Sequence, residues 1–245
     1  MTPTGLRLRL LSRWGQEATS SKGLSGALVG VSTGYMDDAR MDWQELIRRA
    51  HSALAEAIEI SALSGSELPS LMQWAAHVDP PSFGYLAVHG PTKGIDMEPS
   101  ELARCLGGLP GWVTSIVLHP DTLERPQAFR SLGKRLVLEN MDFRKLSGRS
   151  PTDLAKLFDV LPEAGFCLDV AHARSLDPSM GLAHELLDRF GERLRQIHMS
   201  ALDEHGHHIP ITEDDLRVYA PILERCPHIP VIFEAPPPSW LQTHP

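Results

Sequence analysis

The segment Gly165 to Leu176, GFCLDVAHARSL, carries residues whose types and spacing could do chemistry. Its apolar run FCLDV is typical of a buried strand, and Asp169 interrupts that run near its end. A carboxylate in such a run is costly unless it is hydrogen-bonded, paired or bound to a metal. His172 follows three residues later, so both side chains can turn toward one point, and both are good ligands for Zn²⁺ or Mn²⁺. Taken alone, the pair fits equally well an Asp that caps the next helix beside a solvated His.

Similar apolar segments recur along the chain and alternate with segments of helical spacing. We predict strands at residues 27–32, 57–61, 85–90, 115–120, 135–140, 165–170, 195–200 and 230–235. Helices are predicted around residues 41–57, 67–77, 99–106, 150–161, 181–195 and 213–225. Ser150 or Thr152 is expected to cap the fourth of these helices. Strands and helices in alternation predict parallel βαβ units and a (β/α)₈ TIM barrel. An open doubly wound sheet is the alternative, but no strand is followed by GxGxxG or a phosphate-loop sequence.

The two ends of the chain differ from this pattern. Residues 1–25 end in the polar run GQEATSSKG and are predicted to be an extension, partly disordered, so that one barrel domain occupies residues 26–245. The tail after Glu234, APPPSWLQTHP, contains too much proline for a final helix. We therefore expect no regular eighth outer helix, which leaves an exposed flank for an oligomer contact.

Composition restricts the partners. The formal charge of −8 and the pI near 5.8 argue against a basic surface that coats nucleic acid, although a local basic groove is compatible with them. The 3 cysteines show no paired spacing, so neither a disulfide framework nor a cysteine zinc site is suggested, and a reducing compartment fits best. No stretch reaches the roughly 20 apolar residues of a membrane span. We expect a cytoplasmic protein, not bound to a membrane, that acts on a small molecule.

If the predicted strands form a barrel, their carboxyl ends make one rim, where TIM barrels hold their active sites. Strands three to eight each deliver a metal-capable side chain to this rim. These residues are His89, His119, Glu139, Asp169 with His172, His198 and Glu234. One such residue would more often be a hydrogen-bonded structural group, but six strands in register favour a metal site. Imidazoles and carboxylates without thiolates suit Zn²⁺, Mn²⁺ or Fe²⁺, with Zn²⁺ preferred. We expect one to three ions, and two or three would use the ligands more fully, bridged by Glu139 or Glu234.

The segments LAVHGP, IVLHP, LVLENMD, CLDVAHA, IHMS and VIFEAP, in this order and at these separations, resemble the endonuclease IV family of the xylose isomerase-like barrels. The resemblance covers residues 27–236 and implies that the strand-end residues correspond to that family's metal ligands. The loop after strand seven departs from the pattern, because it reads DEHGHHIPI where the family has an Asp-x-His pair that completes a third metal position. His208 fits the family's histidine best, and Gly206 then stands where the aspartate is expected.

Sliding the alignment by one residue places His205 and His207 at these positions instead, and the aspartate is missing in either case. Asp203 or Glu204 is the available substitute, so the third metal position stays open. The endonucleases also grip bent DNA with additional loops, whereas this chain is short and acidic, and nucleic acid is therefore not the favoured substrate.

Other charged residues near the rim have two interpretations. Arg144, Lys145 and Arg174 follow rim strands, and solvation is a more common fate for such residues than a phosphate contact. Glu59, on the second strand, is expected either to approach a substrate or to form a hydrogen bond inside the barrel.

The expected site admits three functions. The favoured one is metal-dependent hydrolysis of a phosphoester, with Glu139 as the bridging carboxylate that orients the nucleophile. The alternative, implied by tagatose epimerase and hydroxypyruvate isomerase relatives, is sugar isomerisation or epimerisation. In those enzymes one divalent ion is held by residues that correspond to Glu139, Asp169, His198 and Glu234. The two glutamates also move protons. His89 and His119 discriminate, because the single-ion site leaves them unused. A barrel that binds metal without catalysis, or serves as an accessory subunit, is the third.

Overall fold

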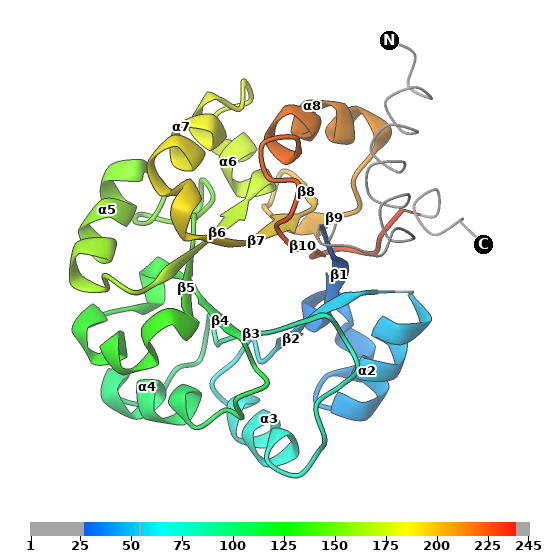
Figure 1. Ribbon diagram of the computed structural model, residues 1–245, viewed down its shortest axis with the longest axis vertical. Helices are drawn as coiled ribbons and strands as arrows, with labels where there is room; N and C mark the ends of the chain where they lie inside the picture. Colours follow the sequence, from blue (N-terminus) through cyan, green and yellow to red (C-terminus); the bar gives the residue numbers. More distant parts are fainter. Residues whose placement is uncertain (1–26, 54, 239–245) are drawn as a thin grey trace, which may run out of the picture.

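The computed structural model describes residues 27–53 and 55–238, and it shows a closed barrel of parallel strands. The order around the barrel is β1-β10-β7-β6-β5-β4-β3-β2, and Figure 1 shows these strands at the centre with helices around them. The strands are β1 Val29–Ser32, β2 Ala57–Ser61, β3 Tyr85–His89, β4 Ser115–Leu118, β5 Leu136–Glu139, β6 Gly165–Asp169, β7 Leu194–Met199 and β10 Val231–Phe233. The predicted TIM barrel is confirmed, with all predicted strands. The extension predicted for residues 1–25 lies outside the described residues.

Each predicted helix is present with small differences at its ends. The helices are α2 Trp43–Ser52, α3 Leu68–Ala75, α4 Pro99–Gly107, α5 Pro151–Val160, α7 Gly181–Phe190 and α8 Glu213–Leu223. Ser150 is the N-cap of α5, because its side chain accepts a hydrogen bond from the Asp153 N–H at 3.1 Å. The helix predicted to run to residue 195 ends at Phe190, since Gly191 caps it and β7 starts at Leu194. In residues 234–238, the described part of the tail, no helix follows β10.

Several connections contain short elements that were not predicted, and three of these connections follow β4, β6 and β7. A helix of 7 residues, α6 (Val170–Leu176), starts directly after β6 and is too short to show an amphipathic pattern. Between β4 and β5 the chain forms the short 3-10 segments η4 (Pro120–Thr122) and η5 (Pro126–Arg135), each with a proline in its first turn. After β7, the strands β8 (Ala201–Leu202) and β9 (His208–Ile209) pair as an antiparallel hairpin.

Alternation along the strands separates two environments. In β5, Leu136 and Leu138 belong to the large apolar core between the strands and the helices, whereas Val137 belongs to a small separate cluster inside the barrel. Because side chains alternate across a strand, Glu139 follows Val137 into the interior. The same alternation in β6 places Asp169 above Cys167. The outward apolar residues of the strands thus pack against the helices. The polar residues that interrupt the apolar runs, Glu139 and Asp169, face the interior of the barrel.

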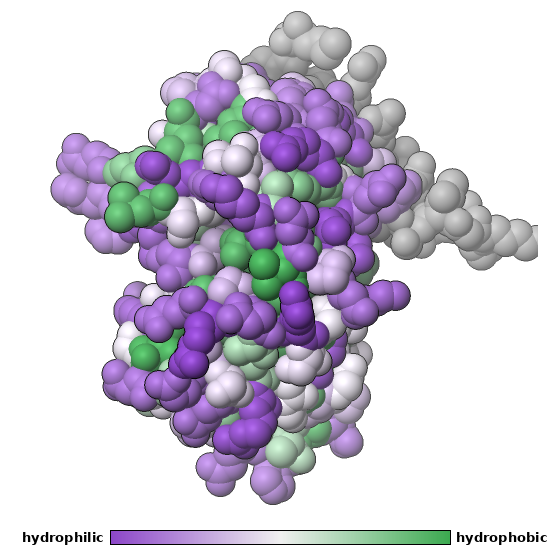
Figure 2. Space-filling view, turned by 90° about the vertical axis from the view of Figure 1, so that its left-hand side faces the viewer, coloured by the Kyte–Doolittle hydropathy of each residue, from purple (hydrophilic) through white to green (hydrophobic). Residues whose placement is uncertain are grey.

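The outer surface agrees with the acidic, polar composition. Figure 2 shows one side of the molecule, where hydrophilic side chains predominate between separate apolar patches. Among the residues that the structure describes, no helix combines the length and apolarity that crossing a membrane requires.

The contact between β1 and β2 gives a test of the barrel. A Cβ atom added at Gly30 would clash with the Ala57 carbonyl oxygen, a backbone atom that cannot move without shifting β2. We expect Gly30→Ala to reduce the free energy of unfolding by about 2 kcal/mol or more. Gly111→Ala is the matched control, because a Cβ there meets nothing within 4 Å, and its effect should stay within about 0.5 kcal/mol. Urea unfolding measures both, and equal effects would contradict this packing.

Candidate metal centre

The carboxyl ends of the strands bring the predicted rim residues together. His89, Glu139 and Asp169 end β3, β5 and β6; His119 and Glu234 follow β4 and β10; His198 lies near the end of β7, His172 in α6 and His208 in β9. They form three overlapping groups, in each of which potential ligand atoms all lie within 4.8 Å of one another. The groups are His89, His119 and Glu139; Glu139, Asp169, His198 and Glu234; and Asp169, His172 and His208. Side chains from distant parts of the sequence therefore converge on a single centre.

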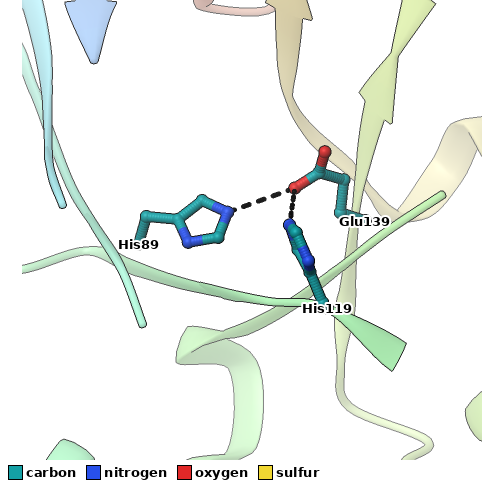
Figure 3. Close-up of side chains that lie close together, drawn as sticks. All are labelled: His89, His119 and Glu139. Atoms are coloured by element: carbon teal, nitrogen blue, oxygen red, sulfur yellow. Dashed lines mark hydrogen bonds and ion pairs between the residues drawn. The ribbon is translucent and has the colours of Figure 1, made fainter. Parts of the chain in front are cut away.

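Glu139 lies at the middle of this centre. Its Oε2 atom is 3.3 Å from His89 Nε2 and 3.4 Å from His119 Nε2, as Figure 3 shows. The same oxygen is 3.5 Å from His198 Nδ1, while Oε1 is 3.1 Å from His172 Nδ1. One carboxylate thus faces four imidazoles, which is the position that a bridging ligand would occupy.

Asp169 combines the two roles that its sequence position left open. Its Oδ1 atom accepts a hydrogen bond from the His172 N–H at 2.7 Å and so caps α6. Its Oδ2 atom is buried without a hydrogen-bond partner among the described residues and lies 3.5 Å from His172 Nδ1. Asn140 fixes this strand end, because its side chain donates to the Asp169 carbonyl and accepts from the Asp169 N–H, both at 2.9 Å. One oxygen therefore holds the helix while the other stays available to a cation.

The buried charged groups of the cluster shift one another's pKa values. Burial raises the pKa of Glu139, but the nearby His198 and His119 outweigh it and hold that pKa well below its usual range. Burial lowers the pKa of His89, yet the hydrogen bond to Glu139 raises it to about 9. Burial and the Asp169 charge oppose each other in the same way at His172, whose pKa rises to about 10. Burial, with the charges of Glu234 and Glu139, raises the pKa of Asp169 well above its usual range. Positive charge on His89 and His172 offsets the other carboxylates, and bound metal ions would supply the same charge.

Unpaired polar atoms test whether the residues fit metal ions. Buried polar atoms are normally hydrogen-bonded, so each exception needs a reason. In the described residues, the buried side-chain atoms without such a bond are Trp74 Nε1 and seven atoms of this centre. Those seven are Glu59 Oε1, His119 Nδ1, Glu139 Oε1, Asp169 Oδ2, His172 Nε2, His198 Nδ1 and Glu234 Oε2. Imidazole nitrogens and carboxylate oxygens are a suitable donor set for Zn²⁺, Mn²⁺ or Fe²⁺, and the residues therefore fit the expected metals.

The histidine-rich loop contributes one residue to the centre. His208 Nδ1 is 3.5 Å from Glu234 Oε2 and 2.7 Å from Ser200 Oγ. His205 and His207 are exposed, and the backbone N–H groups of both donate to the Asp203 carboxylate. This hairpin geometry selects His208 from the two alignments that the sequence allowed.

Gly206 stands where the resemblance led us to expect an aspartate ligand, and its surroundings leave no room for that side chain. The residue has a positive φ of 79°, and a Cβ built on it would meet Arg144 Nε at 2.5 Å. Arg144 therefore occupies the space that an aspartate side chain at position 206 would need. Its guanidinium pairs with the buried Asp142 carboxylate, whose Oδ2 atom is also 3.6 Å from His172 Nε2. A carboxylate from the loop after β5 thus lies beside the third group.

Asp142 is one of three nearby residues that the sequence analysis did not select. It lies in a loop, two residues after the predicted strand 135–140. The only signal in the sequence was its proximity to Glu139 in the run LENMD. Gln196 lies on β7 inside the barrel, where its Nε2 donates to Glu59 Oε2 at 2.6 Å. Tyr85 donates to Gln196 Oε1 at 2.7 Å. Polar residues at inward positions of apolar strands were the available signal for these two.

The basic residues near the rim have acidic partners. Lys145 Nζ lies 2.6 Å from Asp121 Oδ2, and Arg174 Nη1 lies 2.5 Å from Asp215 Oδ1. Arg144 pairs with Asp142, so all three basic residues that follow rim strands in the sequence lie beside a carboxylate. The geometry gives each of them an acidic partner.

Comparisons with known proteins agree with the fold. No protein-family model and no curated protein matches this chain. Endonuclease IV from Thermus thermophilus matches with a TM-score of 0.54 and 18% identity, covering 88% of this chain and 99% of that chain. D-Allulose 3-epimerase from Methylomonas sp. matches with a TM-score of 0.55 and 15% identity, covering 85% and 84%. A probable 3-DHS dehydratase from Bacillus anthracis matches with a TM-score of 0.54 and 11% identity, covering 85% and 92%. At these identities the matches show that this chain shares the fold of the three proteins.

Metal removal should destabilise the protein, because the buried carboxylates then lose their counter-charges. At free metal concentrations about 1,000 times the dissociation constant, binding stabilises a folded chain by about 4 kcal/mol. For a chain of this size we expect a chelator to lower the melting temperature by about 10 °C, and added Zn²⁺ to restore it. Scanning calorimetry measures the shift, and an unchanged melting temperature would argue against a metal centre.

His208 and His207 form a matched pair for the loop. Removing the His208 imidazole takes a donor from the third group, so His208→Ala should weaken metal retention about tenfold or more in competition with a chelator. His207→Ala should leave retention unchanged, because that ring is exposed and contacts Asp203. Equal retention by the two variants would show that His208 is no ligand.

Proposed function

We propose that this chain is a metal-dependent hydrolase of phosphoesters with a centre of at least two ions. The observation that carries the proposal is the group of His89, His119 and Glu139, which exists beside a second group that needs neither histidine. Glu139 is common to both groups, so one carboxylate can join two ions. A single-ion site leaves these two imidazoles, whose ring centroids are 5.0 Å apart, without a chemical task.

The donor arrangement suits phosphoester chemistry. When bound, the ions lower the pKa of a coordinated water and offset negative charge on phosphoryl oxygens. Glu139, between the two groups, is placed to orient the attacking water, and its lowered pKa keeps it ionised. His119, His208 and Glu234 keep 15%, 26% and 13% of their side-chain surface exposed, so they form the open side of the centre. We assign substrate entry to this side, because the other members are almost completely buried.

The fold comparison supports an enzyme, but the substrate has to be inferred from the residues of the centre and its surroundings. Endonuclease IV, one of the structural neighbours, is a hydrolase by name, and this chain covers 99% of its length. The acidic charge of −8 and the paired basic residues favour a small phosphoester over a long nucleic acid.

A single-ion sugar isomerase or epimerase is the second candidate. It is favoured by the completeness of the second group, in which two glutamates, one aspartate and one histidine already provide four donors. Glu139 and Glu234 would then move protons on either side of a bound hydroxy-carbonyl sugar. D-Allulose 3-epimerase has the same fold as this chain.

Metal stoichiometry distinguishes the two candidates. Elemental mass spectrometry on untagged protein should find two or more ions per chain, with about one fewer in His89→Ala and in His119→Ala. His77→Ala is the matched control, because that ring lies on the surface near α3 and should not change the count. One ion, unaffected by either rim substitution, would reject the hydrolase proposal in favour of the single-ion enzyme.

Turnover gives the direct test. We expect hydrolysis of p-nitrophenyl phosphate or bis-p-nitrophenyl phosphate, reduced at least 100-fold by His89→Ala, since the variant lacks one cation beside the phosphoryl group. No turnover of phosphoesters, together with interconversion of ketoses, would assign the second function instead.

A further inference from the structure

Glu59 is a buried carboxylate that the proposed reaction does not use. It lies in the middle of β2, with no exposed surface, and its side chain points into the barrel. Its neighbour there is His198 on β7, although β2 and β7 are not adjacent in the barrel order. The contact therefore crosses the interior. A buried carboxylate is costly unless its oxygens are satisfied, so this position needs a reason.

Two side chains converge on one oxygen of Glu59. Its Oε2 atom is 3.0 Å from His198 Nε2 and accepts a hydrogen bond from Gln196 Nε2 at 2.6 Å, and these two nitrogens are 2.7 Å apart. Tyr85 fixes the orientation of the Gln196 amide, because its hydroxyl donates to Gln196 Oε1 at 2.7 Å. The Tyr85 hydroxyl is also 2.7 Å from Ser115 Oγ. Residues from three other strands thus hold the carboxylate in place.

The other nitrogen of His198 faces the metal centre. His198 Nδ1 is 3.3 Å from Glu234 Oε2 and 3.5 Å from Glu139 Oε2. It has no hydrogen-bond partner in the described residues and is completely buried. The imidazole consequently spans two environments, with Nε2 on Glu59 and Nδ1 among the carboxylates of the second group.

We propose that Glu59 is the positioning residue that prepares His198 as a metal ligand. Accepting the Nε2 proton of His198 keeps the lone pair of Nδ1 free and aims it at the ion. The Tyr85 and Gln196 network then serves to hold Glu59 at that nitrogen. This role rests on the metal centre of the proposed function, but it holds for either of the two candidate reactions.

A direct ligand role for Glu59 is the competing assignment. Glu59, His89 and Glu234 also offer atoms within 4.8 Å of one another, and Glu59 Oε1 has no hydrogen-bond partner in the described residues. The Gln196 amide and the His198 imidazole on Oε2 favour the positioning role, since they fix the carboxylate through contacts that no metal is needed to explain. The two roles differ in what they predict for metal number and metal affinity.

The test uses Glu59→Gln in the full-length protein loaded with Zn²⁺. At saturating Zn²⁺ we expect the ion count of the wild type, whereas chelator competition should show one ion held 10- to 100-fold more weakly. The exposed Glu224→Gln is the control and should leave both measurements unchanged. In Co²⁺-loaded protein, the His198 ring N–H should exchange with solvent faster in Glu59→Gln than in the wild type.

Each alternative has a separate outcome. An ion count one lower at saturating Zn²⁺ would make Glu59 a ligand and overturn the positioning role. Unchanged metal affinity in a folded Glu59→Gln variant, even with a lower melting temperature, would leave Glu59 a structural residue and also overturn it.

Tyr85→Phe supplies a second variant if Glu59→Gln does not fold. It removes only the hydroxyl that orients Gln196, so the same ion should be held more weakly by a smaller factor. An unchanged affinity in Tyr85→Phe would then refute the network. Wild-type protein that binds ions but hydrolyses no phosphoester would reject the proposed function and leave the role of Glu59 intact.

Discussion

The mutual repulsion of buried carboxylates is the constraint on which this structure depends. Glu139, Asp169 and Glu234 each place an oxygen within 4.8 Å of the others and of His198. At an effective dielectric constant of about 20, each ionised pair at that distance costs roughly 3.5 kcal/mol. Apolar packing around the barrel cannot offset several such pairs, so protons on the histidines or on a carboxylate, or bound metal ions, must relieve the repulsion. Burial, with the charges of Glu234 and Glu139, raises the pKa of Asp169 well above its usual range. The raised pKa of His172, to about 10, shows how strongly the carboxylates demand positive charge once burial has been overcome.

Strand alternation explains why much of this centre could be predicted from the sequence. Parallel strands end at one rim, so a polar residue that ends an apolar run must join its counterparts from the other strands. His89, Glu139 and Asp169 end their strands in this way. Their convergence follows from local patterns and a closed barrel. The identity of the barrel itself followed from the number of strands, which short-range periodicity reveals well.

Contacts that depend on three-dimensional position could not be predicted in this way. Asp142 reaches His172 from a loop, and the hairpin register decides that His208, and not His207, turns toward Glu234. The contact of Glu59 with His198 joins residues 139 positions apart on strands that are not neighbours. A sequence gives the direction of each side chain relative to its strand, but the distance across the barrel depends on strand tilt and register. The register shift between Phe166 and Cys167 against β7 is one such irregularity.

The same electrostatic constraint ranks the three groups. The second group contains three carboxylates, Glu139, Asp169 and Glu234, and is the richest in negative charge, whereas the first has only Glu139, which it shares with the second. The third group has His172 and His208 but only Asp169, whose charge it divides with the second. Its nearest additional carboxylate, Asp142, is already neutralised by Arg144, whose side chain fills the space above Gly206. A cation at the third group would have to compete with this fixed guanidinium, because both need the same carboxylate. The carboxylates therefore favour a cation most at the second group, and the nearby Arg144 guanidinium disfavours one at the third.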